Sequence, residues 1–211
     1  MPPFWRPEPL FTGDTVFCLA GGPSLRDFDF ASLAGKRVIA VNEAIKSYPA
    51  ADILYFWDDT WFVRNQALVH YRAGLTVTGS RMAAQQCERL RYIELQADAP
   101  LEAGAQAVRK GRSSGHTAIA LAVACGASRV VLLGYDMRTV DGRSHFHDAY
   151  SARDEARMAG EWIPAFKGWA KDAKKAGVAI VNATPGSALK EFPAVKVAAE
   201  LQHGAVAAGR V

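Results

Sequence analysis

Short apolar runs recur along the chain, and most of them end in small or polar residues. The strongest, Ser128–Leu133, is a continuous run of β-branched residues and leucine, typical of a central strand in a parallel sheet. Similar runs occupy Thr15–Ala20, Arg37–Asn42, Ala51–Trp57 and Gly177–Asn182, and weaker candidates are Gly74–Thr78 and Arg91–Leu95. A chain built from such runs must bury both faces of the sheet that they form.

Helical stretches separate these strands. Ser114–Cys125 is rich in alanine, follows serines that can cap a helix, and is stopped by Gly126. The stretch 154–176 is amphipathic, and it contains three breakers, Gly160, Pro164 and Gly168, which predict a break or kink. Strands that alternate with helices predict an α/β fold: a Rossmann-like, mostly parallel sheet with helices on both faces in a single domain.

A chain of 211 residues favours one domain. We expect an N-terminal extension over residues 1–13, a nucleotide-binding α/β domain over 14–190 and a C-terminal tail over 191–211. The alanine-rich part of the tail, from Ala194, is expected to be a loosely held helix or disordered.

The composition, 50% hydrophobic and 22% charged, is that of a globular protein, and no apolar run is long enough to span a membrane. The N-terminus does not read as a secretory signal. The three cysteines, Cys18, Cys87 and Cys125, are widely spaced and form no CxxC motif. We therefore expect a cytoplasmic protein with core cysteines and no transition metal. The net charge of +4 suits an anionic small molecule.

A glycine-rich turn, Gly21-Gly22-Pro23-Ser24, follows the first predicted strand. Glycines allow backbone amides to approach a phosphate, but the turn matches neither the GxGxxG fingerprint nor a P-loop. A plain tight turn is the alternative.

Polar residues also follow the next two strands. Asn42 ends one of them, where ligands bind in open α/β sheets, although asparagine is also a common turn residue. Asp58 and Asp59 end the other and could hold Mg²⁺ beside a diphosphate, or could cap a helix.

Three further clusters complete the set of candidates. Ser113, Ser114 and Gly115 begin the alanine-rich helix, where an anion or simple capping is expected, and His116 is expected to be a structural or a surface histidine. Gly134-Tyr135-Asp136 follows the strongest strand and leads into a polar loop that contains His145 and His147, which could act as a general base or bind a metal. The cluster 182–187 follows the last strand, and together these clusters predict a single crevice along one edge of the sheet.

The order VFCLAGGPSL, VIAVN, ADILYFWDD, SSGHTAIALAVACGASRVVLLGYDM, a histidine-bearing loop and VAIVNATPGS resembles one superfamily. It contains the bacterial CMP-sialic-acid-dependent sialyltransferases and the 6-hydroxymethylpterin diphosphokinase-like proteins, and we expect a bacterial or phage member. The resemblance spans roughly residues 14 to 190. It departs at residue 21, because the sialyltransferases have GNGPSL and this chain has AGGPSL.

The resemblance implies that a nucleotide lies on Gly22, Asn42, Ser113, Ser114, Gly115 and Asp136. It also implies that a histidine of the loop, His145 or His147, is the base. Between the two, we favour His147 because Asp148 and Tyr150 follow it and could orient it. The sialyltransferase lid is longer, so a further expectation is that the acceptor pocket is either missing or supplied by a second subunit of a homo-oligomer.

Three hypotheses of function follow. The first is glycosyl transfer from a nucleotide-activated sugar to an unknown acceptor, with a histidine base. The second is a Mg²⁺-dependent pyrophosphokinase that uses ATP and holds the metal on Asp58, Asp59 and Asp136. The third is a non-catalytic bacterial or phage accessory protein that shares the fold.

Overall fold

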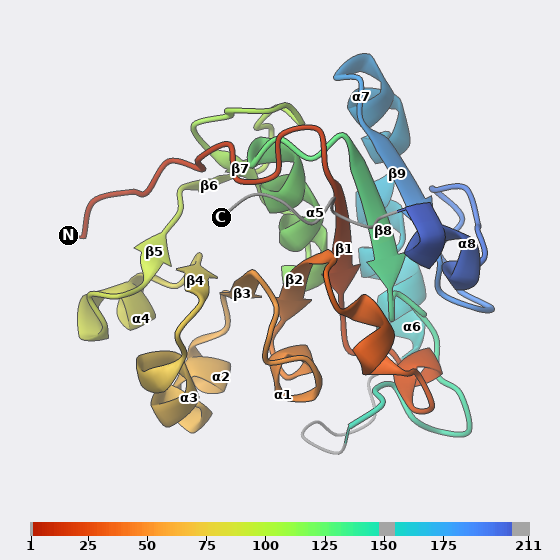
Figure 1. The fold of residues 1–211 in the computed structure, drawn as a ribbon, viewed down its shortest axis with the longest axis horizontal. Helices are drawn as coiled ribbons and strands as arrows, with labels where there is room; N and C mark the ends of the chain where they lie inside the picture. The colour runs from red at the N-terminus through yellow and green to blue at the C-terminus, as the bar shows by residue number, and fades with distance from the viewer. Residues whose placement is uncertain (1, 148–154, 204–211) are drawn as a thin grey trace.

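A computed structural model describes residues 2–147 and 155–203 of the chain. Its centre is a seven-stranded sheet in which every neighbouring pair of strands is parallel, in the order β5-β4-β3-β2-β1-β8-β9 (Figure 1). The strands are β1 (Thr15–Leu19), β2 (Arg37–Val41), β3 (Ile53–Phe56), β4 (Leu75–Thr78), β5 (Arg91–Tyr92), β8 (Arg129–Leu133) and β9 (Ala179–Asn182). The predicted α/β fold with a parallel sheet is confirmed.

One predicted strand is confirmed only in part. The run Arg91–Leu95 is divided between β5 and the start of β6 (Leu95–Gln96). β6 leaves the main sheet and pairs with β7 (Val108–Arg109) in a small second sheet. The run is apolar enough for a strand, but the sheet that it joins changes in its middle, which periodicity alone does not reveal.

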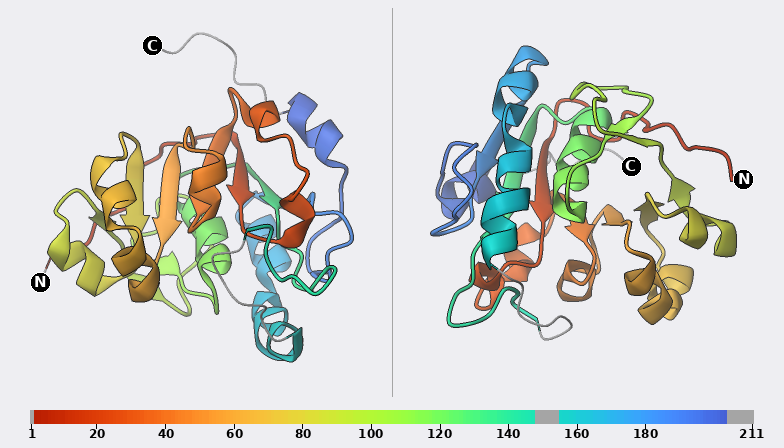
Figure 2. Two further views of the ribbon diagram at one scale, coloured as in Figure 1. Left: turned by 90° about the horizontal axis from the view of Figure 1, so that it is seen from below. Right: turned by 180° about the vertical axis from the view of Figure 1, so that it is seen from behind.

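Helices cover both faces of the sheet, as expected (Figure 2). They are α1 (Ala44–Ser47), α2 (Asp59–Arg64), α3 (Gln66–Tyr71), α4 (Arg81–Gln86), α5 (Ser114–Ala124), α6 (Glu155–Arg157), α7 (Trp169–Lys175) and α8 (Val197–His203). Alternate residues of β1 enter two separate cores: Val16 and Cys18 pack with α5 and α7, whereas Phe17 and Leu19 pack with α1 to α4 and α8. Helix α5 is buried along its whole length, which explains its small residues.

The predicted break in the stretch 154–176 is confirmed. After α6, the chain makes a π-helical turn (Met158–Trp162) and a 3₁₀ turn (Pro164–Phe166) before α7 begins. Gly168, with φ of 86°, precedes α7 in the left-handed region that favours glycine. We call residues 155–166 the crossover segment, because they lead from β8 towards β9.

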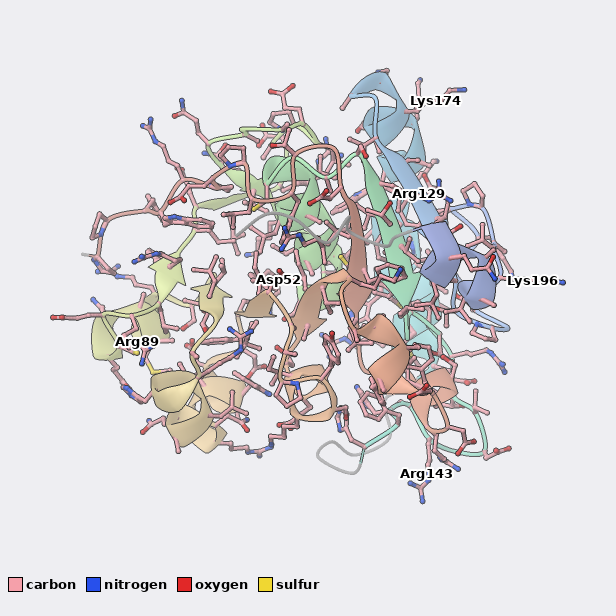
Figure 3. The ribbon with its side chains drawn as sticks, in the orientation of Figure 1. Asp52, Arg89, Arg129, Arg143, Lys174 and Lys196 are labelled. Carbon is pink, nitrogen blue, oxygen red and sulfur yellow. The ribbon has the colours of Figure 1, made fainter. Side chains whose placement is uncertain are left out.

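The C-terminal helix is not loosely held. The Arg129 guanidinium at the start of β8 donates to both carboxylate oxygens of Glu200 on α8, at 2.8 Å each. Arg129 is labelled in Figure 3. Glu200 is buried, so this ion pair ties the helix to the sheet. The last tail residues, 204–211, lie outside the described part of the chain.

Two further expectations can be compared with this fold. Cys18, Cys87 and Cys125 are all buried free thiols, as expected. Among the described residues, no helix is both long and apolar enough to cross a membrane.

The strand order creates one favoured place for a ligand. The chain moves outward from β1 to β5 and then returns to place β8 on the other side of β1. Ligands of open α/β sheets bind at such a reversal, outside the carboxyl ends of the strands. The glycine-rich turn follows β1 and Asp136 follows β8, so both lie at this point.

Candidate functional site

A cavity of about 580 Å³ lies at the carboxyl ends of β1, β2, β3 and β8. It brings together most of the residues that the sequence singles out: Gly21, Gly22, Asn42, Asp58, Ser113, Ser114, Gly115, Gly134, Asp136, His145 and His147. Pro23, Ser24 and Asp59 are not part of its lining. The volume suits a small-molecule ligand such as a nucleotide.

The single crevice expected from the strand-end clusters is wrong in one part. Residues of the cluster 182–187 line a separate cavity of about 480 Å³. Their polar groups serve the protein itself: Thr184 Oγ1 accepts from the Tyr135 N–H at 3.0 Å, and Ser187 Oγ donates to the Tyr135 carbonyl at 2.6 Å. This cluster therefore supports the loop after β8.

The glycine-rich turn uses most of its backbone donors internally. The Gly22 N–H donates to the Gly134 carbonyl at 2.9 Å, and the Ser24 N–H donates to Asp136 Oδ1 at 3.1 Å. Pro23 has no N–H. Of the four residues, Gly21 alone has an N–H for which no acceptor is found in the described structure. The expectation that this turn presents several amides to a phosphate is therefore wrong.

Asp136 holds the turn in place. Its Oδ2 accepts from the Ser24 hydroxyl at 2.8 Å, and the residue is 1% exposed. Burial raises the pKa of Asp136, and the two hydrogen bonds from Ser24 oppose that rise. A Cβ on Gly22 would lie 1.9 Å from Asp136 Oδ2, so only glycine allows this close packing.

Asn42 adopts an unusual backbone conformation beside the cavity. Its φ is 52°, in the left-handed region that asparagine tolerates better than most residues. Its N–H donates to the Tyr55 carbonyl at 3.1 Å, while its Oδ1 is buried and has no partner among the described residues. An unpaired buried amide oxygen is available to a ligand.

The two aspartates after β3 have structural roles. Asp58 accepts from the Trp61 N–H at 2.7 Å and caps α2, which confirms the capping interpretation. Asp59 accepts from the Ser80 hydroxyl. Within residues 2–147 and 155–203, no three histidines, cysteines or carboxylates are grouped as a metal site. Among these residues, Asp58, Asp59 and Asp136 are therefore not grouped together.

The first turn of α5 differs from the glycine-rich turn. No acceptor in the described part of the chain meets the Ser114 or Gly115 N–H, and both residues line the cavity. The Ser113 side chain does not cap the helix; it contacts His116 instead. The Tyr135 hydroxyl donates to the Gly115 carbonyl at 2.9 Å and braces this turn.

The loop after β8 places two imidazoles against the glycine-rich turn. The Phe146 N–H donates to the Gly21 carbonyl at 3.1 Å, and the ring centroids of His145 and His147 lie 5.1 Å apart. A Cβ on Gly21 would lie 3.1 Å from His145 Cδ2 and 3.2 Å from His147 Nε2, so the missing side chain at residue 21 leaves room for both rings. Ser144 Oγ lies 2.9 Å from His145 Nδ1.

Asp148 and Tyr150, the residues expected to orient His147, lie outside the described residues. His116 is structural, as expected, since it is buried and its ring stacks on Phe166 with 3.6 Å between centroids. Burial lowers the pKa of His116 to about 4, against the opposing effect of its hydrogen bond to the Trp162 carbonyl.

Sequence reasoning missed several residues of the cavity. Arg112 and Arg157 supply positive charge, and Trp57, Met158 and Trp162 supply apolar surface. Arg112 directly precedes Ser113, so its place beside a helix start could have been noticed. Arg157 and Trp162 come from the crossover segment, whose position above the sheet has no local sequence signal.

The chain is similar in fold to a known transferase. The sialyltransferase CstII from Campylobacter jejuni, solved in complex with a substrate analogue, cytidine-5′-monophosphate, matches with a TM-score of 0.54 at 13% identity, over 87% of this chain and 85% of that chain. A second CstII structure, in complex with CMP-3FNeuAc, has a TM-score of 0.48 at 13% identity, over 86% and 85%. No protein-family model and no curated protein matches the chain. At this identity the likeness shows a shared α/β fold.

Proposed function

We propose that this chain transfers a glycosyl group from a nucleotide-activated sugar to an acceptor. The observation that carries the proposal is the start of α5, where the Ser114 and Gly115 N–H groups have no acceptor in the described structure and line the cavity. Backbone donors at the start of an 11-residue helix favour an anion. Arg112 and Arg157 in the same cavity add positive charge for a leaving nucleotide phosphate.

The nucleoside part of the donor is proposed to lie beside Asn42. The buried Oδ1 of Asn42 needs a hydrogen-bond donor, and a ribose hydroxyl or a base amine provides one. The likeness in fold to CstII, which was solved with cytidine monophosphate, makes CMP the first nucleotide to test.

One imidazole of the loop after β8 is proposed to accept the proton of the acceptor hydroxyl. His145 and His147 both line the cavity, and a neutral imidazole has the basicity for this step near pH 7. We retain His147 as the first candidate. Asp136 is proposed as a positioning residue, because Ser24 engages both of its oxygens.

The assignment predicts that one histidine matters far more than the other, because a single proton is moved. Single substitutions His145→Ala and His147→Ala, followed by pH profiles of turnover, test this. Full activity in the double variant would show that neither histidine is the base and that the loop after β8 has a structural role.

Calorimetry with CMP, UDP, GDP and ATP tests the proposed function directly. Each nucleotide is titrated once with EDTA and once with Mg²⁺. Metal-independent binding of one nucleotide supports glycosyl transfer, and no binding at millimolar ligand contradicts it. Binding that needs Mg²⁺ and is lost in Asp58→Ala would favour the pyrophosphokinase. Turnover of an activated donor would end the non-catalytic hypothesis.

A further inference from the structure

A buried histidine in the first turn of α5, His116, contacts two residues of the cavity wall. His116 Nδ1 is 2.9 Å from Ser113 Oγ, and His116 Nε2 is 3.0 Å from the Trp162 carbonyl oxygen. Ser113 precedes α5 and Trp162 ends the π-helical turn of the crossover segment, and both line the cavity. His116 thus joins two elements that are 46 residues apart in the chain.

The packing around His116 leaves its ring little freedom. The ring stacks on Phe166 at an interplanar angle of 9° and meets the edge of Trp169, with 5.8 Å between centroids. Gly111 is also close, because a Cβ on it would lie only 2.1 Å from the His116 Cβ. The positions of both ring nitrogens are therefore set by their surroundings.

The two partners fix the proton on the ring. A carbonyl oxygen only accepts hydrogen bonds, so Nε2 must carry the hydrogen that reaches Trp162. Complete burial against an aromatic ring disfavours the charged imidazolium, so Nδ1 carries no hydrogen and accepts. The Ser113 hydroxyl must then donate its only hydrogen to Nδ1, and it presents only lone pairs to the cavity.

We propose that His116 is a positioning residue that makes Ser113 a hydrogen-bond acceptor within the cavity. Ser113 then recognises a donor group of the nucleoside, a ribose hydroxyl or a base amine, and does not bind a phosphate oxygen. This assignment rests on the proposed function only for the identity of the ligand. Two adjacent serines then have different roles: the Ser114 backbone N–H binds the phosphate, and the Ser113 hydroxyl binds the nucleoside.

The first test needs no ligand. In protein labelled with ¹⁵N-histidine at pH 7.5, the His116 ring should show a protonated Nε2 and an unprotonated Nδ1. The resonance is assigned by its absence from His116→Phe, which keeps an aromatic ring against Phe166. A protonated Nδ1, or an imidazolium, would overturn the proposal.

The second test compares cytidine with CMP in NMR titrations. Ser113→Ala should weaken both ligands by the same factor, about fivefold, because the lost hydrogen bond does not involve the phosphate. His116→Phe should have a similar effect. The double variant should bind each ligand no more weakly than the single variant with the lower affinity. A loss confined to CMP in Ser113→Ala, or fully additive losses in the double variant, would contradict the proposal.

The two tests separate two kinds of failure. If neither cytidine nor CMP binds the unsubstituted protein, the choice of a cytidine nucleotide is wrong, and the tautomer of His116 still decides whether the hydrogen-bond relay exists. If CMP binds but the tautomer is the opposite one, the proposed function stands and this inference fails.

Discussion

Two turns border the cavity, and they use their backbone donors in opposite ways. In the glycine-rich turn, the N–H groups of Gly22 and Ser24 donate to the loop after β8, at 2.9 and 3.1 Å. At the start of α5, the N–H groups of Ser114 and Gly115 meet no acceptor in the described structure. Both turns consist of small residues, but in the described structure the glycine-rich turn leaves only the Gly21 N–H without an acceptor, whereas the start of α5 leaves two consecutive N–H groups for a ligand. The segment that packs against a turn therefore decides whether the N–H groups of the turn bind a ligand or hold neighbouring parts of the protein in place.

The largest effect is expected from Gly22→Ala, which disrupts the close packing of the glycine-rich turn. The added methyl group would lie 1.9 Å from Asp136 Oδ2 and 2.4 Å from the Gly134 carbonyl oxygen. We expect the free energy of unfolding to fall by about 3 kcal/mol, measured by urea denaturation.

Gly160→Ala is the matched control for this change. A Cβ at Gly160 meets nothing within 4 Å, and its backbone is not in the left-handed region. Its unfolding free energy should stay within about 1 kcal/mol of the unsubstituted value. Equal losses of unfolding free energy in the two variants would show that the glycine-rich turn is not tightly packed.

The second prediction concerns the pH dependence of stability that His116, in the first turn of α5, confers. The pKa of His116 is lowered to about 4 by burial, whereas an unfolded histidine titrates near 6.5. Between these values the unfolded chain binds more protons, so this residue costs stability as the pH falls, about 2.5 kcal/mol by pH 4.5.

His116→Phe removes this contribution. The difference between the unfolding free energies of the unsubstituted protein and the variant should be constant above pH 7. Below about pH 6.5 the unsubstituted protein should lose stability relative to the variant. The comparison needs urea denaturation of both proteins at several pH values. Parallel curves throughout this range would mean that the His116 pKa is not depressed.

Much of the fold could be predicted from the sequence because its strands are buried on both faces. Continuous apolar runs such as Ser128–Leu133 are a strong local signal, and the breakers Pro164 and Gly168 interrupt the stretch 154–176 as expected. The start and end of α5 were also predicted to within a residue of Ser114–Ala124.

The site was harder to predict, because its character depends on contacts between distant residues. The donors of the glycine-rich turn are taken by residues more than 100 positions away, such as Asp136, which is 112 positions from Ser24. The cluster 182–187 resembles the others in composition but bonds to the loop after β8. No local pattern distinguishes these cases.

The third prediction tests the structural role of the glycine-rich turn. Ser24→Ala removes the hydroxyl that donates to Asp136 Oδ2 at 2.8 Å and leaves a buried carboxylate without this donor. We expect a loss of about 2 kcal/mol in unfolding free energy at pH 7.5. The pKa of Asp136, already raised by burial, should rise further.

The loss in Ser24→Ala should therefore shrink as the pH falls and the Asp136 carboxyl is protonated. Urea denaturation at pH 7.5 and at pH 4 measures this change. Because Ser24 does not line the cavity, nucleotide affinity should be unchanged in the folded variant. A large loss of nucleotide affinity with normal stability would show that the glycine-rich turn contributes to ligand binding.

The central claim is that the backbone at the start of α5 binds the phosphate of a nucleotide. Ser114 is the first residue of α5, where proline is tolerated, so Ser114→Pro removes one N–H while the helix can persist. Ser114→Ala removes the hydroxyl and keeps the N–H. Calorimetry with CMP and EDTA should give an affinity within twofold of the unsubstituted protein for Ser114→Ala and about tenfold weaker for Ser114→Pro. Equal affinities in the two variants, or no nucleotide binding by the unsubstituted protein, would contradict the account.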